Sequence, residues 1–248
     1  MFQNRQKLIE LVNKYHQAIS ANDILKVEEY LDAEDSPPGL IDTEYLNVSP
    51  IMYAAQEGFW DLTLKLFERE ANLDVKTEPF NWYLLHECIV NGTDKVFRNV
   101  VKYADFSVKT KEGKNALMIA IEKGKFERAH YLLDNGKAVV YDKDSKRRTA
   151  LHYAALQNNQ DLFIKLVQKG ANIFEEDKEK KNPMDLLTDE IFRNSLPTLL
   201  EKMKIEVINP NKTEEKTLEA EIKEEIKITS VEEEKPKISS LSKLVKKK

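Results

Sequence analysis

The chain has 248 residues, a formal net charge of −4, 41% hydrophobic residues and 33% charged residues. This charge is too small to predict nucleic-acid binding by the molecule as a whole, and no apolar run approaches the length of a membrane span. The single cysteine, Cys88, excludes an internal disulfide and a cysteine-based zinc site, and fits a reducing compartment such as the cytoplasm. The N-terminal residues lead into an amphipathic pattern, so no cleavable signal peptide is expected.

Two amphipathic helices are predicted over residues 5–32, with a turn and cap at Asn22 and Asp23. The first apolar stripe contains Leu8, Ile9, Leu11, Val12, Tyr15 and Ile19, and the second contains Ile24, Val27, Tyr30 and Leu31. Residues 33–48 include Ser36-Pro37-Pro38-Gly39, which excludes a helix there. This segment is either a plain surface loop or part of a binding surface.

From Ser49 onward the sequence repeats a turn followed by two short helices. The copies begin at residues 49, 83, 115, 149 and 182, in steps of 34, 32, 34 and 33 residues. In the first copy Gly58 separates a helix with Ala54 and Ala55 from an amphipathic one with Leu62, Leu66 and Phe67. Such short helices bury their apolar faces only against neighbours of the same kind, so a stacked array is predicted.

These copies resemble ankyrin repeats over roughly residues 13–203. Thr149-Ala150-Leu151-His152 and Ser49-Pro50-Ile51-Met52 resemble the Thr-Pro-Leu-His opening of that family. Lys169-Gly170-Ala171-Asn172 resembles the Gly-Ala-Asp that closes the second helix. The resemblance implies an all-α ankyrin-repeat solenoid of about five to six repeats, in which hairpin fingers alternate with helix pairs.

Three regions are expected. Residues 1–48 form a helical N-terminal capping repeat with its Pro-containing loop, and residues 49–204 form the repeats and a C-terminal cap. The cap helix is expected to use Ile191, Phe192, Leu196, Leu199 and Leu200. Residues 205–248 form a disordered Glu/Lys-rich tail, because so few apolar side chains cannot offset the entropy of ordering the chain.

The fingers differ in their turn chemistry. The finger in residues 71–82 lacks the family's Asp-Gly turn and is expected to be distorted, whereas the finger at residues 109–114 keeps Gly113 for a tight turn. Residues 135–148 end in a basic finger, and residues 174–181 form one of mixed charge.

No catalytic site, cofactor or metal is predicted. His86 and His152 share one repeat position, and the resemblance implies that this histidine makes a hydrogen bond across the turn between repeats. Cys88 aligns with Ala54, Ala120 and Ala154, so it is predicted to be a small buried residue. Neither a catalytic triad nor a glycine-rich phosphate loop is visible, so an enzyme is not expected.

In ankyrin repeats, partners usually dock on the fingers and inner helices of the concave face. The resemblance therefore implies binding positions in three fingers and on the inner helices. They are Lys76, Phe80, Trp82, Lys109, Lys111, Lys114, Glu122, Lys123, Lys143, Lys146, Arg147, Arg148, Gln157 and Asn158. A tryptophan beside basic residues favours a protein partner with an acidic surface. Alternatively, Phe80 and Trp82 pack back onto their own finger, and the lysines only maintain solubility.

The predicted function is non-catalytic binding of another protein by a cytoplasmic monomer. The alternative is a secreted bacterial effector whose repeats bind a host protein, because the Glu-rich tail resembles export signals of such effectors. The tail is otherwise a solubilising extension, or a partner-binding motif anchored by Leu218, Ile222, Ile226 and Ile228. Nucleic-acid binding through residues 143–148 is a further alternative, although none is expected.

Overall fold

The structure is a computed structural model that describes residues 2–136 and 138–203. The expected disordered tail, with its interpretations as an export signal, motif or extension, lies outside the described residues. Within them, no helix is both long enough and apolar enough to cross a membrane.

The described residues are mostly helical. They contain eleven α-helices, two 3₁₀ helices and one pair of two-residue strands. The order is α1 (Phe2–Ser20), α2 (Ile24–Asp32), η1 (Leu40–Asp42), α3 (Pro50–Gln56), α4 (Trp60–Glu68), β1 (Lys76–Thr77), β2 (Trp82–Tyr83), α5 (Leu84–Val90), α6 (Asp94–Tyr103), α7 (Ala116–Glu122), α8 (Phe126–Asp134), α9 (Ala150–Leu156), α10 (Gln160–Gln168), η2 (Pro183–Leu186) and α11 (Glu190–Lys202).

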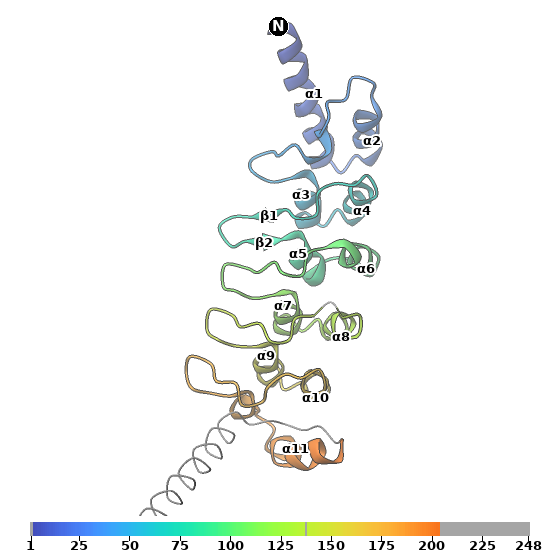
Figure 1. The fold of residues 1–248 in the computed structure, drawn as a ribbon. Coiled ribbons are helices and arrows are strands. Elements are labelled where there is room, and N and C mark those ends of the chain that lie inside the picture. Colours follow the sequence, from blue (N-terminus) through green and yellow to red (C-terminus); the bar gives the residue numbers. More distant parts are fainter. Residues whose placement is uncertain (1, 137, 204–248) are drawn as a thin grey trace, which may run out of the picture. The chain divides into compact units, whose positions relative to one another are not determined.

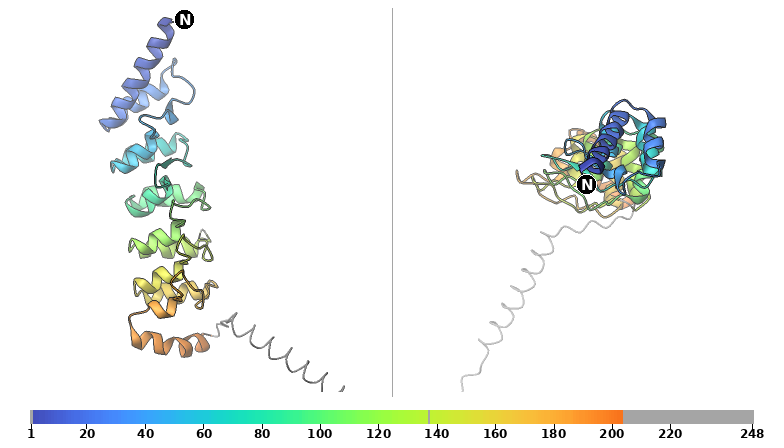
Figure 2. Two further views of the ribbon diagram at one scale, coloured as in Figure 1. Left: turned by 90° about the vertical axis from the view of Figure 1, so that its left-hand side faces the viewer. Right: turned by 90° about the horizontal axis from the view of Figure 1, so that it is seen from above.

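Residues 2–203 form a stack of helix pairs. The inner helices α3, α5, α7 and α9 lie in one column, and the outer helices α4, α6, α8 and α10 lie in a second column beside it (Figure 1). Each inner helix packs on its own outer helix and on the next inner helix. The side view in Figure 2 shows the same succession, from the α1–α2 pair at one end to α11 at the other. The predicted solenoid is confirmed.

Small residues let the inner helices approach closely. Ala54, Cys88, Ala120 and Ala154 have no exposed surface. Burial raises the pKa of the Cys88 thiol to about 12, so this cysteine is an inert part of the core, as predicted. Apolar residues of the outer helices, such as Leu62, Val100, Leu132 and Leu166, complete each layer. Each fully buried side chain of this kind stabilises the fold by about 1.5–3 kcal/mol.

Several apolar positions expected in the end helices are exposed. Leu8 is 44% exposed, because α1 has 19 residues and its partner α2 only 9, which leaves the first turns of α1 beyond the helix pair. Ile9 is 52% exposed for the same reason. Ile191 is 83% exposed, whereas Phe192, Leu196 and Leu200 carry the buried stripe of α11.

The expectation that residues 33–48 contain no helix is wrong for one short turn. The 3₁₀ helix η1 begins after the prolines, where Gly39 adopts a φ of +81° and caps it. Leu40 is buried in the core, and the Asp42 carboxylate accepts a hydrogen bond of 2.9 Å from the backbone N–H of Asn72. The loop is therefore anchored to the repeat that follows it.

Candidate binding surface

The three later fingers share one five-residue turn, formed by residues 110–114, 144–148 and 177–181. In each, the N–H of the first residue donates to the C=O of the fifth, and the side chain of the first residue accepts from a backbone N–H of the turn. The fourth residue has a positive φ, which favours glycine. These fourth residues are Gly113 at +79°, Arg147 at +62° and Lys180 at +62°.

Backbone hydrogen bonds also link successive fingers. In each link, an N–H near the tip of one finger donates to a carbonyl of the finger before it. The links run from Lys111 to Phe80 at 2.8 Å, from Ser145 to Glu112 at 2.7 Å, and from Lys178 to Lys146 at 2.9 Å. The fingers project from the same side of the stack (Figure 1) and are held in one row. A surface built in this way is pre-organised before any partner arrives.

The finger in residues 71–82, which we call the first finger, differs from the later ones, as its sequence predicted. It is nevertheless regular in part. Strands β1 and β2 pair antiparallel, with Lys76 opposite Tyr83 and Thr77 opposite Trp82. The tip between them contains a cis peptide bond before Pro79. Asn81 supplies the positive φ of +50° that closes the tip, a conformation that asparagine tolerates better than most residues.

Trp82 is held against its own repeat. Its indole N–H donates to the Glu87 carboxylate at 2.7 Å, and its ring centroid lies 5.3 Å from that of His86. The Asn91 amide donates to the other carboxylate oxygen of Glu87 at 2.5 Å. Trp82 is half-buried, and its partners Glu87 and His86 lie on α5 of the same repeat and not on the finger itself. Replacing Trp82 would disturb the fold, so it is a poor probe of binding alone.

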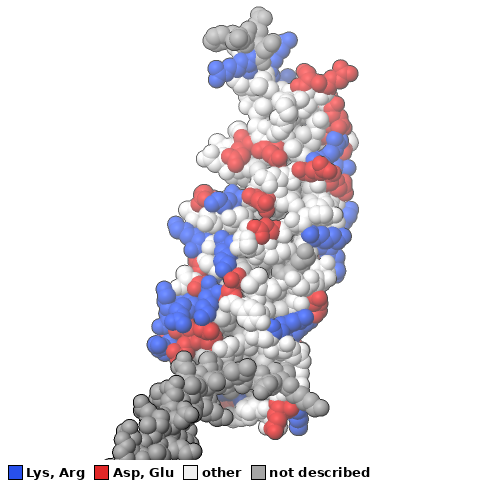
Figure 3. All heavy atoms as spheres, viewed as in Figure 1, with Lys and Arg blue, Asp and Glu red and all other residues white. Residues whose placement is uncertain are grey.

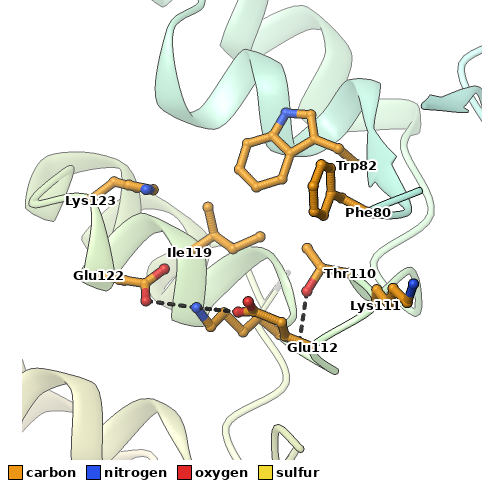
Figure 4. A pocket seen from close by; sticks show the side chains of 9 residues that line it. Phe80, Trp82, Thr110, Lys111, Glu112, Ile119, Glu122 and Lys123 are labelled. Carbon is orange, nitrogen blue, oxygen red and sulfur yellow. Dashed lines mark hydrogen bonds and ion pairs between the residues drawn. The ribbon is translucent and has the colours of Figure 1, made fainter. Parts of the chain in front are cut away.

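Phe80 is 68% exposed and borders a hollow of about 260 Å³, which we call the Phe80 hollow (Figure 4). Six predicted binding residues line it: Phe80, Trp82, Lys111, Lys114, Glu122 and Lys123. Thr110, Glu112 and Ile119 complete the lining and were not predicted. Ile119 points up from α7 toward the two aromatic rings, so the middle of the hollow is apolar.

A second hollow of about 360 Å³, the Tyr153 hollow, lies one repeat further along the stack. Its predicted members are Lys114, Glu122, Lys146, Arg148 and Gln157. Glu112, Asp144, Ser145, Tyr153 and Leu156 were not predicted. Leu156 is 46% exposed and supplies an apolar surface.

Lys114 stands between the two hollows and lines both. Its ammonium lies 2.7 Å from a carboxylate oxygen of Glu112 and 2.7 Å from one of Glu122. Burial alone would lower the pKa of Lys114, but these two carboxylates raise it overall, so the lysine stays charged. Lys114 also lies 5.8 Å from the centre of the Tyr153 ring. It therefore forms a fixed wall between the hollows.

Most of the predicted basic strip is neutralised by neighbouring acids. Figure 3 shows lysines and arginines interspersed with acidic residues over the later fingers. The pairs are Lys76 with Glu78 at 2.9 Å, Lys109 with Asp142 at 2.8 Å, Lys143 with Glu175 at 2.5 Å, Arg147 with Glu175 at 3.7 Å, and Arg148 with Asp177 at 3.2 Å. Exposed pairs of this kind stabilise little, but they cancel the field that a phosphate backbone would require.

Three predicted lysines remain without an ion pair in the described part of the chain, and one of them, Lys146, lines the Tyr153 hollow. Lys111 at a finger tip and Lys123 at the end of α7 are both exposed, and both line the Phe80 hollow. By contrast, the predicted residues Lys76, Lys109, Lys143, Arg147 and Asn158 do not line either hollow. The Asn158 side chain instead accepts a hydrogen bond of 3.3 Å from the backbone N–H of Asp189.

The two histidines behave differently. His152 accepts the N–H of Thr149 at 3.1 Å and donates from Nε2 to the carbonyl of Lys181 at 3.3 Å, which is the bond between repeats that the resemblance implied. His86 accepts the N–H of Tyr83 at 3.2 Å, but its Nε2 has no hydrogen-bond partner among the described residues. Burial lowers the pKa of His86 to about 4. Within residues 2–136 and 138–203, no group of three or more His, Cys, Asp or Glu side chains is arranged so that it could hold a metal ion.

Two of the residues that sequence reasoning missed share one repeat position. Ile119 and Tyr153 are each the fourth residue after the start of their copies, where earlier copies carry Tyr53 and Glu87. In the structure Glu87 contacts Trp82, Ile119 faces the Phe80 hollow, and Tyr153 donates its hydroxyl to the Asp144 carboxylate at 2.7 Å. This position therefore faces the fingers, and aligning the copies would have indicated it.

Comparison with known proteins agrees with this architecture. Residues 85–177 match a family model described as ankyrin repeats in three copies. The protein glp-1 of Caenorhabditis elegans is 35% identical over 120 residues, which cover 43% of this chain and 9% of that protein. A homologue of transient receptor potential cation channel subfamily A member 1, from the same animal, is 25% identical over 143 residues, covering 57% of this chain and 11% of that protein. The chain thus spans about a tenth of these relatives.

Proposed function

Because this chain is built of ankyrin repeats, which generally serve as protein–protein interaction modules, we propose that it binds another protein without catalysis. The partner docks on the finger row and the inner helices, over the Phe80 hollow and the Tyr153 hollow. The chain acts as a monomer that presents a rigid surface, so little entropy is lost on docking.

The observation that carries this proposal is the exposed Phe80 ring at the edge of a hollow. A large aromatic side chain at the tip of a finger is unfavourable in water, and aromatic residues beside pockets are enriched among the side chains that dominate binding energy. The bond from the Lys111 N–H to the Phe80 carbonyl ties this finger to the one that follows it. The neighbouring half-buried Trp82 adds apolar surface for a partner to cover.

The proposal is tested by placing a photo-crosslinking amino acid at position 80 of the full chain, in an extract of its source cells. A matched chain carries the same group at Tyr103, which is also an exposed aromatic residue but lies at the end of the outer helix α6. We expect a protein that crosslinks from position 80 and not from position 103.

The captured protein is then purified and its affinity measured directly. Phe80→Ala should weaken binding about tenfold or more, as loss of a central aromatic contact does, while Tyr103→Ala should leave it unchanged. Equal crosslinking from both positions, or an unchanged affinity of Phe80→Ala, would place the partner elsewhere and contradict the proposed surface.

A further inference from the structure

The Phe80 hollow has an apolar centre between two cationic ends. Figure 4 shows Lys123 at one end and Lys111 at the other, with Trp82, Phe80 and Ile119 between them. Lys123 comes from the C-cap of α7, and Lys111 comes from the turn that bonds to the carbonyl of Phe80. The two cations thus sit on separate, fixed elements.

Of the three lysines that line the Phe80 hollow, Lys111 and Lys123 are available for a partner and Lys114 is not. Lys114 already contacts two carboxylates, and the described basic residues of the later fingers mostly pair with acids. Lys111 and Lys123 have no ion pair within the described residues. An incoming carboxylate would therefore gain a charge-assisted contact without breaking an existing one.

Resting on the proposed function, we infer that the Phe80 hollow recognises a short extended segment of the partner with one large apolar side chain between two acidic ones. The apolar side chain packs against the exposed ring of Phe80 and the half-buried ring of Trp82, above the buried Ile119. Alternate residues of an extended chain point to the same side. The acidic residues therefore stand two positions before and two positions after the apolar residue, facing Lys123 and Lys111.

The charges of the hollow favour a peptide over a nucleic acid. Bases could stack on Phe80, but the Glu112 and Glu122 carboxylates line the same hollow and would repel a phosphate chain. A carboxylate peptide carries charge only at the two positions that meet a lysine. The apolar residue at the centre of the peptide is uncharged, so these glutamates do not repel it.

The inference is tested with the full chain and a fluorescent peptide containing Glu-Ser-Phe-Ser-Glu, measured by anisotropy. Control peptides carry lysine in place of both glutamates, or alanine in place of the phenylalanine. We expect the first peptide to bind about tenfold more tightly than either control. Lys111→Glu with Lys123→Glu should reverse the preference toward the lysine peptide, whereas Lys102→Glu, an exposed change on α6, should not.

Phe80→Ala should weaken the acidic peptide about tenfold, with helicity and Tm unchanged, because the ring is exposed. Equal affinity for the acidic and basic peptides, or a preference that survives the double charge reversal, would overturn the inference. The inference would also be overturned if the chain bound oligothymidine and not the peptides, and if Phe80→Ala abolished that binding. The proposed function would still hold if the purified partner needed Phe80 for binding. Failure of this inference can therefore be distinguished from failure of the proposed function.

Discussion

The first finger and the later fingers use their side chains in opposite ways. In two of the later fingers, Asp144 and Asp177 are buried within their turns, and Lys143 and Arg148 beside Asp144 pair with acids of the next finger. In the first finger a strand pair and a proline-containing tip replace this turn, and Phe80 is left exposed. The exposed Phe80 therefore lies in the finger that departs from the repeat pattern. In the regular fingers, polar side chains form hydrogen bonds and ion pairs within and between the fingers.

Asp144→Ala should have the largest effect on stability among changes to the fingers. One oxygen of its carboxylate accepts the N–H groups of Lys146 at 2.8 Å and Arg148 at 2.7 Å, and the other accepts the Tyr153 hydroxyl at 2.7 Å. Leaving these donors unpaired should cost about 3 kcal/mol, measured by urea unfolding. Thr110→Ala, which removes one bond of 3.2 Å at the same turn position, should cost about 1 kcal/mol. Equal losses would show that the two turns are not held differently.

Asp177→Asn should destabilise the protein by about 2 kcal/mol at neutral pH, because the charged acceptor of buried hydrogen bonds is lost. Burial by itself would raise the pKa of Asp177, but the N–H groups of Lys181 and Glu179 and the Arg148 guanidinium lower it overall. Because the pKa of Asp177 is lower in the folded protein than in the unfolded chain, where it is near 4, its ionised carboxylate stabilises the fold at pH values above 4. This stabilisation is lost as the pH falls through the pKa of the folded protein. The stability gap between the two proteins should therefore close on acidification. A gap that is the same at pH 3 and pH 7 would contradict this role.

Gly113→Ala should destabilise the protein by roughly 1–2 kcal/mol. Its φ is +79°, and an added Cβ would lie 3.2 Å from the backbone nitrogen of Ser145, in the link to the next finger. Gly124→Ala is the control, because Gly124 has a φ of +67° and open space around it. This control carries the backbone strain without any contact to a neighbouring finger. A Gly113→Ala protein that melts at the same temperature as Gly124→Ala would show that the approach of the fingers is not tight.

Arg147→Gly should have the smallest effect and the opposite sign. Arg147 adopts a φ of +62° at the turn position where Gly113 stands in the previous finger. Relief of this strain should stabilise the protein by about 0.5 kcal/mol, after the loss of an exposed ion pair with Glu175. The measurement is the midpoint of thermal unfolding, and a decrease in that midpoint would mean that the ion pair outweighs the strain.

Repeat phasing was enough to predict the stack and much of the surface. Period and small residues placed Ala54, Cys88, Ala120 and Ala154 between the inner helices, and the structure confirms their burial. The same phasing placed Phe80, Lys111 and Lys123 near one another, although they are far apart in the sequence. The phase does not reveal which side chains pair. For that reason the basic strip looked available in the sequence, although Lys109, Lys143 and Arg148 are engaged with acids about one repeat further on.

The sequence by itself determined the architecture, because a period of about 33 residues with small residues at fixed positions leaves short helices no way to bury their apolar faces except by stacking. Only the tertiary structure decided which groups are left for a partner. Trp82 bonds to Glu87 and Lys114 bonds to Glu112 and Glu122, whereas Phe80 is left exposed and Lys111 and Lys123 without an ion pair. The physical reason is that a side chain's availability depends on neighbours brought close by folding, and these lie on other elements of the stack.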